Sequence, residues 1–153
     1  MSFPAKAVVI LPWQNDRVLM QLRDDKPGIV YPGRWGFFGG SIESGESPIG
    51  SAKRELHEEI GYTTKEMFAL SIDRISAPHD ITLHSFYCPL MIHISQISLL
   101  EGFDFGLFTF KEVHSNQLFS AKANGNCPVI KHPYIEYLFK KFIQRIDTNK
   151  GTN

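Results

Sequence analysis

The chain has 153 residues, of which 42% are hydrophobic and 21% are charged. This length fits one domain with a sizeable buried core, and the composition excludes an intrinsically disordered chain. The 16 basic and 16 acidic residues cancel, so no net field of the whole molecule attracts nucleic acid or an anionic membrane. We expect neither as a partner, and any phosphorylated ligand must be held by a local site.

Cysteine usage and the N-terminal segment indicate a compartment. Cys88 and Cys127 cannot build a disulfide framework, and neither belongs to a CxxC pair, which favours two thiols in a reducing environment. The apolar run over 7–11 is too short for the core of a signal peptide, and Pro12 interrupts it. No stretch approaches the ~20 apolar residues of a membrane span. The sequence therefore predicts a cytoplasmic protein.

The first elements are predicted to be strands on either side of a long loop. Residues 5–11 are apolar and rich in β-branched side chains, which predicts a buried strand. A turn at 15–16 would join it to a second strand over 17–22 as a hairpin. Residues 23–33 contain several Asp, Pro and Gly residues, which is typical of a surface loop long enough to be functional. A short aromatic strand is expected over 35–40.

A helix is predicted next, over 48–60. Ser47 suits the N-cap, Pro48 suits the first helical position, and Gly61 suits the position after the last turn. Further strands are expected over 67–76, 81–94 and 104–110.

The C-terminal segment predicts an amphipathic helix that begins near Pro133. It would bury Leu138, Phe142 and Ile146, and the polar residues 147–153 are expected to form a disordered tail. Mixed strands and helices over one short chain favour an α/β (α+β) sandwich. We therefore expect a single domain over 1–146.

Three glutamates share one face of the predicted central helix. At 100° per residue, Glu55, Glu58 and Glu59 fall within an arc of about 100°. Like charges at this spacing repel, so a cation is needed to offset them. Arg54 is one such cation, and a bound Mg²⁺ or Mn²⁺ is another, because both metals prefer oxygen ligands. The three glutamates alone are more typical of a solvated acidic helix face than of a site.

The residues around this helix favour the metal site. Residues 40–62 resemble the signature of the Nudix hydrolase family, GX₅EX₇REUXEEXGU, in which U is an aliphatic residue. Its seven fixed positions are occupied by Gly40, Glu46, Arg54, Glu55, Glu58, Glu59 and Gly61. Seven such matches arise by chance in about one chain per million. The chain departs from the family at Tyr62, where an aliphatic residue is usual, and at Phe38, where many relatives carry proline.

The resemblance implies an α/β/α sandwich with a mixed β-sheet and a Mg²⁺- or Mn²⁺-dependent hydrolase that cleaves a phosphoanhydride bond. It assigns Glu58 and Glu59 as the principal metal ligands. It leaves Glu55 as either a third ligand or the base that activates water. In the family, the carbonyl of a glycine equivalent to Gly39 or Gly40 often completes the metal shell.

Other roles follow from the same resemblance. Arg54 and Glu46 would orient the metal-binding carboxylates without binding the metal themselves. Family members often place a further acidic residue on a later loop, where it binds metal or acts as a base. Glu101 and Asp104 are the candidates here, and Glu101 is favoured because it precedes a glycine and an aromatic strand.

Residues that flank the signature are candidates for substrate binding. Aromatic side chains can stack on a base or a sugar, and arginines can contact phosphate. The aromatic candidates are Trp35, Phe37 and Tyr31, and the arginine candidates are Arg23 and Arg34. Histidine or aspartate candidates for a base are His79, Asp80 and His84.

The signature does not specify the substrate beyond a nucleoside diphosphate linked to another group. Pro78 lies near the position where ADP-ribose-cleaving relatives carry a proline, and nucleotide sugars such as ADP-ribose rank first. A hydrolase that removes modified nucleoside triphosphates is the alternative, followed by a catalytically silent nucleotide-binding regulator. RNA cap removal is disfavoured by the zero net charge and the short chain. The sequence does not fix the oligomeric state, although homodimers are common among relatives and one is a candidate here.

Overall fold

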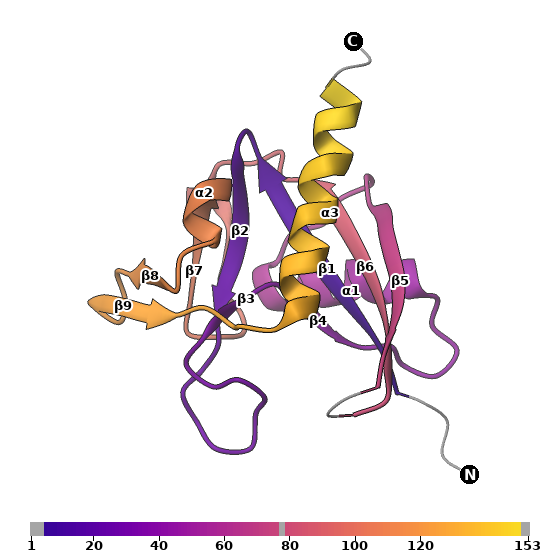
Figure 1. Cartoon of the computed structure of the whole chain (residues 1–153), viewed down its shortest axis with the longest axis horizontal. Helices are drawn as coiled ribbons and strands as arrows, with labels where there is room; N and C mark the ends of the chain where they lie inside the picture. The colour runs from indigo at the N-terminus through magenta and orange to yellow at the C-terminus, as the bar shows by residue number, and fades with distance from the viewer. Residues whose placement is uncertain (1–4, 77–78, 151–153) are drawn as a thin grey trace.

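A computed structural model describes residues 5–76 and 79–150 (Figure 1), so Pro78 lies outside the described residues. Within these ranges, seven strands form one sheet and two more form a separate hairpin. The sheet contains β1 (Ala5–Gln14), β2 (Arg17–Leu22), β3 (Trp35–Gly36), β4 (Phe38–Ser41), β5 (Phe68–Ile75), β6 (Ile81–Pro89) and β7 (Asp104–Thr109). The hairpin is made of β8 (Gln117–Ser120) and β9 (Gly125–Pro128). The helices are α1 (Pro48–Ile60), α2 (Phe110–Val113) and α3 (Pro133–Lys150), with a 3₁₀ turn at Ile94–Gln96.

The sheet is mixed, as expected. Its main order is β3-β2-β1-β6-β5, with β4 paired to β1 and β7 paired to β2. The central pair β1 and β6 is parallel, and the other pairs are antiparallel. Asn15 adopts a left-handed φ of 57° between β1 and β2, which gives the tight turn of the predicted hairpin.

Pro12 lies inside β1 and does not end the strand, in contrast to the expected end at residue 11. Along one edge, β1 pairs with β4 through Ile10 and with β2 from Trp13 onward. Pro12 falls in the gap between these two ladders, where a missing N–H removes no hydrogen bond on that edge. Its other neighbour, Cys88 of β6, keeps the parallel register.

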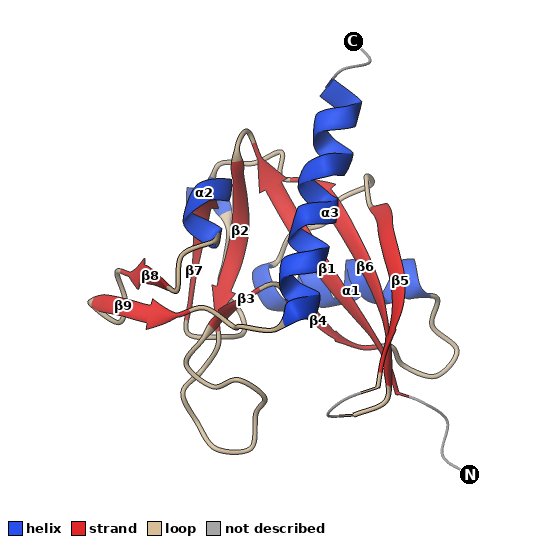
Figure 2. Ribbon diagram, in the orientation of Figure 1, coloured by secondary structure: helices blue, strands red, loops and turns tan. Residues whose placement is uncertain are grey.

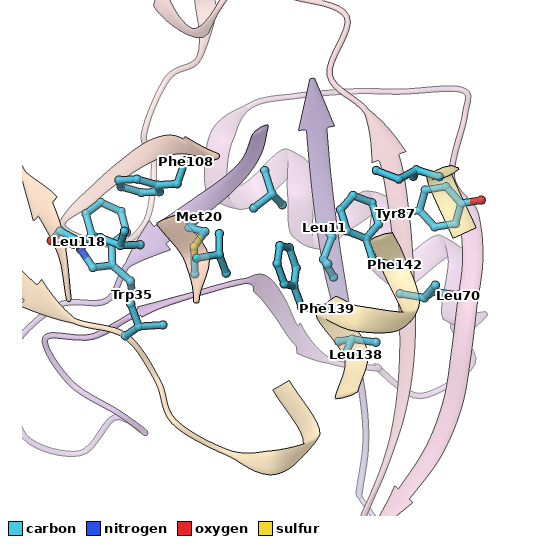
Figure 3. Close-up of a cluster of buried hydrophobic side chains, with 14 of the residues drawn as sticks. Leu11, Met20, Trp35, Leu70, Tyr87, Phe108, Leu118, Leu138, Phe139 and Phe142 are labelled. Atoms are coloured by element: carbon cyan, nitrogen blue, oxygen red, sulfur yellow. Dashed lines mark hydrogen bonds between the residues drawn. The ribbon is translucent and has the colours of Figure 1, made fainter. Parts of the chain in front are cut away.

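One helix covers each face of the sheet (Figure 1, Figure 2). Helix α3 lies over one face, and its Leu138, Phe139 and Phe142 pack into a cluster with side chains of β1, β2 and β6 (Figure 3). Helix α1 packs on the opposite face through Ala52 and Leu56. This arrangement confirms the sandwich, and it confirms that Leu138, Phe142 and Ile146 are buried.

Three further elements have bounds that differ from the sequence-based expectation, and one hairpin was not expected. Strand β6 ends at Pro89 rather than 94, because the chain turns there toward the 3₁₀ segment. Helix α3 continues to Lys150, so residues 147–150 extend a helix already anchored by Ile146 instead of starting the expected tail. The strand expected over 35–40 is interrupted at Phe37, and the β8–β9 hairpin was not predicted. No helix in the described ranges is long and apolar enough to cross a membrane.

Candidate active site

Helix α1 is positioned by its caps and its apolar face, as the sequence predicts. The Ser47 Oγ accepts a hydrogen bond from the Gly50 N–H at 3.1 Å, and Pro48 occupies the first turn. Gly61 adopts a left-handed φ of 66° and donates its N–H to the His57 carbonyl at 2.9 Å. With Leu56 fully buried against the sheet, the glutamate face of the helix turns toward the loops at one end of the sheet.

Arg54 joins several of the signature carboxylates. Its Nε and Nη2 donate to the two carboxylate oxygens of Glu46 at 2.7 and 3.0 Å. Its Nη1 donates to Glu55 and to Glu58, both at 3.1 Å, and Nη2 reaches the Ser41 carbonyl at 3.1 Å. The guanidinium holds the pKa of Glu46 down, at about 2, mainly through these hydrogen bonds. Arg54 therefore binds the loop before α1 to the helix and aligns two of its glutamates.

Glu59 is the most deeply buried of the three helix glutamates. Only 5% of the residue is exposed, and its carboxylate accepts one hydrogen bond, from the Gly39 N–H at 3.2 Å. Among the described residues, no Lys, Arg or His lies within ion-pair distance of it. Burial, and next the charge of Glu55, raise the pKa of Glu59 to about 8. A buried carboxylate with no paired cation is costly, and a bound cation would remove that cost.

Gly39 and Gly40 lie where side chains would obstruct the site. A Cβ on Gly40 would collide with the Glu55 carboxylate, and a Cβ on Gly39 would collide with the backbone carbonyl of Val8 in β1. Glu55 is partly buried, and this burial raises its pKa despite the opposing effect of Arg54. Gly40 therefore leaves space that the Glu55 carboxylate fills, which gives a physical reason for glycine at the first signature position.

A cavity of about 530 Å³ opens beside Glu59. It is lined by Gly39, Glu59 and Glu101, and by residues of β2 and the long loop, namely Gln21, Arg23, Asp24, Lys26 and Ile29. Glu101 thus faces the same space as Glu59, as the sequence favoured. Asp104 is engaged elsewhere, since its Oδ2 accepts a 2.6 Å hydrogen bond from the Ser120 hydroxyl.

The donors around this cavity fit a hard divalent cation. The available ligand atoms are carboxylate and carbonyl oxygens, which Mg²⁺ and Mn²⁺ prefer, and Glu59 lacks a cation of its own. Within the described ranges, however, no three acidic, His or Cys side chains converge closely enough to share one ion. Arg54 engages Glu55 and Glu58 at 3.1 Å each, whereas the Glu59 carboxylate accepts its hydrogen bond from the Gly39 N–H.

Two of the proposed substrate residues are structural. Trp35 is 1% exposed, packs edge-on against Phe108 at 4.9 Å between ring centroids, and donates its Nε1 hydrogen to the Leu118 carbonyl at 3.0 Å. Phe37 stacks on Phe139 of α3, on the face of the sheet opposite α1. Both rings pack into the α3-side cluster and neither lines the cavity, so the predicted stacking on substrate gains no support and stays a prediction. Arg23 does line the cavity, and its buried Nε has no hydrogen-bond partner in the described part of the chain.

Several remaining candidates lie apart from this cavity. Asp80 pairs with Arg74 at 2.8 and 2.9 Å, His84 lies within β6 opposite Ile72, and neither lines the cavity. Tyr31 and Arg34 are exposed on the long loop, outside the cavity lining.

Sequence reasoning missed several residues of the cavity, among them Gln21, Asp24 and Lys26. The available signal for Gln21 was a single polar residue inside an otherwise apolar strand.

The structure also explains the two departures from the family signature. Tyr62 is buried, and its hydroxyl donates to the Pro89 carbonyl at 3.0 Å and accepts from the Met91 N–H at 3.1 Å. Phe38 is fully buried in the α1-side core.

A sequence profile described as the NUDIX domain matches residues 3–93, which include the whole signature and the strands that hold it. The chain belongs to the Nudix family. An oxidized purine nucleoside triphosphate hydrolase from Mus musculus is 33% identical over 89 residues, which cover 56% of this Nudix chain and 55% of that protein. The nucleoside triphosphatase NudI of Escherichia coli O139:H28 is 42% identical over 50 residues, 31% of this chain and 34% of the relative.

The match to these curated relatives therefore spans about half of one protein and a third of the other. Among solved structures, the NUDIX domain of Shewanella oneidensis NrtR complexed with ADP ribose superposes with a TM-score of 0.67. The two chains are 16% identical, and the alignment covers 95% of this chain and 90% of the NrtR domain. At this identity the superposition establishes the shared fold.

Proposed function

We propose that this Nudix chain is a Mg²⁺- or Mn²⁺-dependent pyrophosphohydrolase that cleaves a phosphoanhydride bond in a nucleoside diphosphate derivative. The observation that carries the proposal is that Glu59 of α1 and Glu101 of a later loop line one cavity together with Arg23 and Lys26. The carboxylates of this cavity suit a divalent cation, and its cationic side chains suit phosphate oxygens.

Glu58, Glu59, Glu101 and the Gly40 carbonyl are the groups that we assign to the metal, with Glu55 as a further ligand or as the base for water. When bound, the metal would polarise phosphoryl oxygens and lower the pKa of a coordinated water. Arg54 orients Glu55 and Glu58 through its 3.1 Å contacts.

Other side chains act on the substrate itself. Arg23 and Lys26 would neutralise phosphate charge in the same cavity. For Arg23, the unpartnered Nε hydrogen supports this role, because a phosphate oxygen would satisfy it.

We infer that nucleoside triphosphates are the first substrates to test, and nucleotide sugars such as ADP-ribose the second. The two relatives with 33% and 42% identity are named as triphosphate hydrolases, whereas the ADP-ribose-bound NrtR domain shares 16% identity. This order reverses the one favoured by the sequence, because Pro78 supplied only a positional hint.

A cytoplasmic location and a homodimer stay predictions. Light scattering would measure the oligomeric state.

The decisive experiment is a panel of oxidised and ordinary nucleoside triphosphates, nucleotide sugars, dinucleoside polyphosphates and capped RNA, assayed with Mg²⁺, with Mn²⁺ and with a chelator. The proposal expects turnover that requires metal and that releases pyrophosphate from triphosphates or two monophosphates from nucleotide sugars. The variants Glu58→Gln and Glu59→Gln should lose turnover by at least 10-fold while remaining folded. Glu136→Gln, which changes an exposed glutamate on α3, is the matched control and should keep full activity.

The same panel separates the enzyme from a catalytically silent regulator. A silent nucleotide-binding domain would bind one nucleotide of the panel in calorimetry and would turn over none of them. Activity that persists in the chelator would refute the assigned role of the metal.

A further inference from the structure

Gln21 is a buried polar residue in a strand that otherwise packs apolar side chains. In β2, Met20 and Leu22 belong to the core cluster under α3, while Leu19 belongs to the cluster under α1. Because side chains alternate along a strand, Gln21 lies on the same face as Leu19. It is only 5% exposed, and burying an amide is costly unless it forms hydrogen bonds.

The Gln21 amide is bonded to the loop that carries Glu101. Its Nε2 donates to the Glu101 carbonyl at 3.0 Å. The same loop is also bonded to α1, because the N–H groups of Leu100 and Glu101 both donate to the Glu59 carbonyl, at 2.9 and 3.3 Å. The backbone of Glu101 is therefore held between the C-terminal turn of α1 and the end of β2.

Gly102 permits this close approach. It adopts a left-handed φ of 92°, and a Cβ at this position would lie 2.6 Å from the Gln21 Nε2. A larger residue would both strain the backbone and push the amide away from the loop. At the next residue, the Phe103 N–H donates to the Leu22 carbonyl at 2.9 Å, so the chain is bonded to the end of β2 directly after Gly102.

We propose that Gln21 is a positioning residue that fixes the Glu101 backbone at the cavity that Glu59 also lines, and thereby completes the metal-binding carboxylates of that cavity. The inference rests on the proposed function, because it assumes that Glu101 contributes to metal binding. Gln21 acts through the Glu101 backbone and has no role in contacting substrate. Removing its amide should leave the sheet intact but free the Glu101 carboxylate to move relative to Glu59.

The test replaces Gln21 by methionine, which keeps the length and removes the donor. Gln14→Met is the matched control, because the Gln14 Nε2 also donates to backbone carbonyls, those of Leu90 and Ile92, at 2.9 Å each, but Gln14 does not line the cavity. Mn²⁺ affinity is measured by calorimetry and electron paramagnetic resonance without substrate. Steady-state kinetics at saturating Mn²⁺ then give kcat and KM.

We expect Gln21→Met to weaken Mn²⁺ binding on the order of 10-fold, and to lower kcat while KM for the nucleotide stays unchanged. Gln14→Met should bind Mn²⁺ like the parent, even if both variants lose similar thermal stability. Equal Mn²⁺ affinity in Gln21→Met and the parent would overturn the proposal. A raised nucleotide KM with normal Mn²⁺ binding would also overturn it, because Gln21 would then contact the substrate.

Gly102→Ala provides a second route if Gln21→Met does not fold. The added methyl group should displace the Gln21 amide and weaken Mn²⁺ binding in the same direction, and unchanged binding in a folded Gly102→Ala protein would count against the proposal. If the parent itself shows neither Mn²⁺ binding nor turnover, the proposed function fails first. Normal binding in the parent with no effect in either variant rejects the role of Gln21 alone.

Discussion

Arg54 and Glu46 form a two-point ion pair across eight residues of sequence, with contacts of 2.7 Å from Nε to Oε2 and 3.0 Å from Nη2 to Oε1. Glu46 Oε1 also accepts the Glu43 N–H at 3.1 Å, so the pair fixes the loop between β4 and α1. The fork geometry of a guanidinium matches a carboxylate at both atoms, and an ammonium cannot reproduce it. The pair therefore sets where Arg54 presents its remaining donors to Glu55 and Glu58.

Arg54→Lys should lower kcat/KM by about 10- to 100-fold and leave the fold intact. A single ammonium keeps the charge but cannot hold Glu46, Glu55 and Glu58 together. Steady-state kinetics and circular dichroism on the parent and the variant test this expectation.

Arg74→Lys is the matched control, because Arg74 forms a similar two-point pair with Asp80 on the surface. Its kcat/KM should equal that of the parent. If both lysine variants lost activity equally, a general effect on the fold would replace the specific role of Arg54.

The buried Glu59 predicts an unusual dependence of stability on pH. Its pKa is raised to about 8 in the folded protein, whereas an unfolded glutamate titrates near ~4.3. Between these values the folded state binds the proton and the unfolded state does not, so the free energy of unfolding falls as the pH rises. The metal-free protein should lose at most about 1.4 kcal/mol per pH unit across this window from Glu59.

Denaturant unfolding from pH 5 to pH 8, with and without Mg²⁺, measures the effect. Mg²⁺ should stabilise the protein most at the upper end, because it binds the ionised carboxylate. Glu59→Gln should flatten the slope in the metal-free protein, and Glu136→Gln should not. An equal slope in parent and Glu59→Gln would show that other groups dominate the titration.

The local features of the site follow from the sequence because they depend on short-range chemistry. Ser47, Pro48 and Gly61 determine the helix ends through their own backbone preferences, and the structure confirms all three. Glu101 was favoured over Asp104 as the further acidic residue because of its neighbours in sequence; it lines the cavity, and its role there stays a prediction.

Features that depend on which face of the sheet a side chain meets did not follow from the sequence. Trp35 and Phe37 lie beside the signature, but both rings pack toward α3, and no local pattern distinguishes the two faces of a short strand. The β8–β9 hairpin was missed because its flanks are polar, although Asn124-Gly125 is a turn signal. Gln21 required knowledge of a contact 80 residues away.

The two glycines before the signature helix should differ in their response to alanine. Gly40→Ala should keep the fold and reduce kcat, because the new methyl group displaces the Glu55 carboxylate, a movable side chain. Gly39→Ala should destabilise the protein by about 1–3 kcal/mol or more, because the methyl group meets the backbone of β1. Unfolding curves and kcat for both variants distinguish these effects.

Gly125→Ala is the control, since a Cβ there meets no atom within 4 Å. It should change neither quantity. The interpretation of Gly40 would be wrong if Gly40→Ala kept the full kcat of the parent.

Trp35→Phe should reduce stability without changing substrate affinity. Phenylalanine cannot donate to the Leu118 carbonyl, and the loss of this buried hydrogen bond should cost about 1–3 kcal/mol. Trp13→Phe is the comparison, because the buried Trp13 Nε1 has no hydrogen-bond partner among the described residues and has no such bond to lose. Chemical denaturation should therefore show a larger loss for Trp35→Phe, while the nucleotide KM of both variants stays at the parent value. A raised KM in Trp35→Phe with unchanged stability would restore the stacking role that its position in the sequence suggested, and would contradict its burial against Phe108.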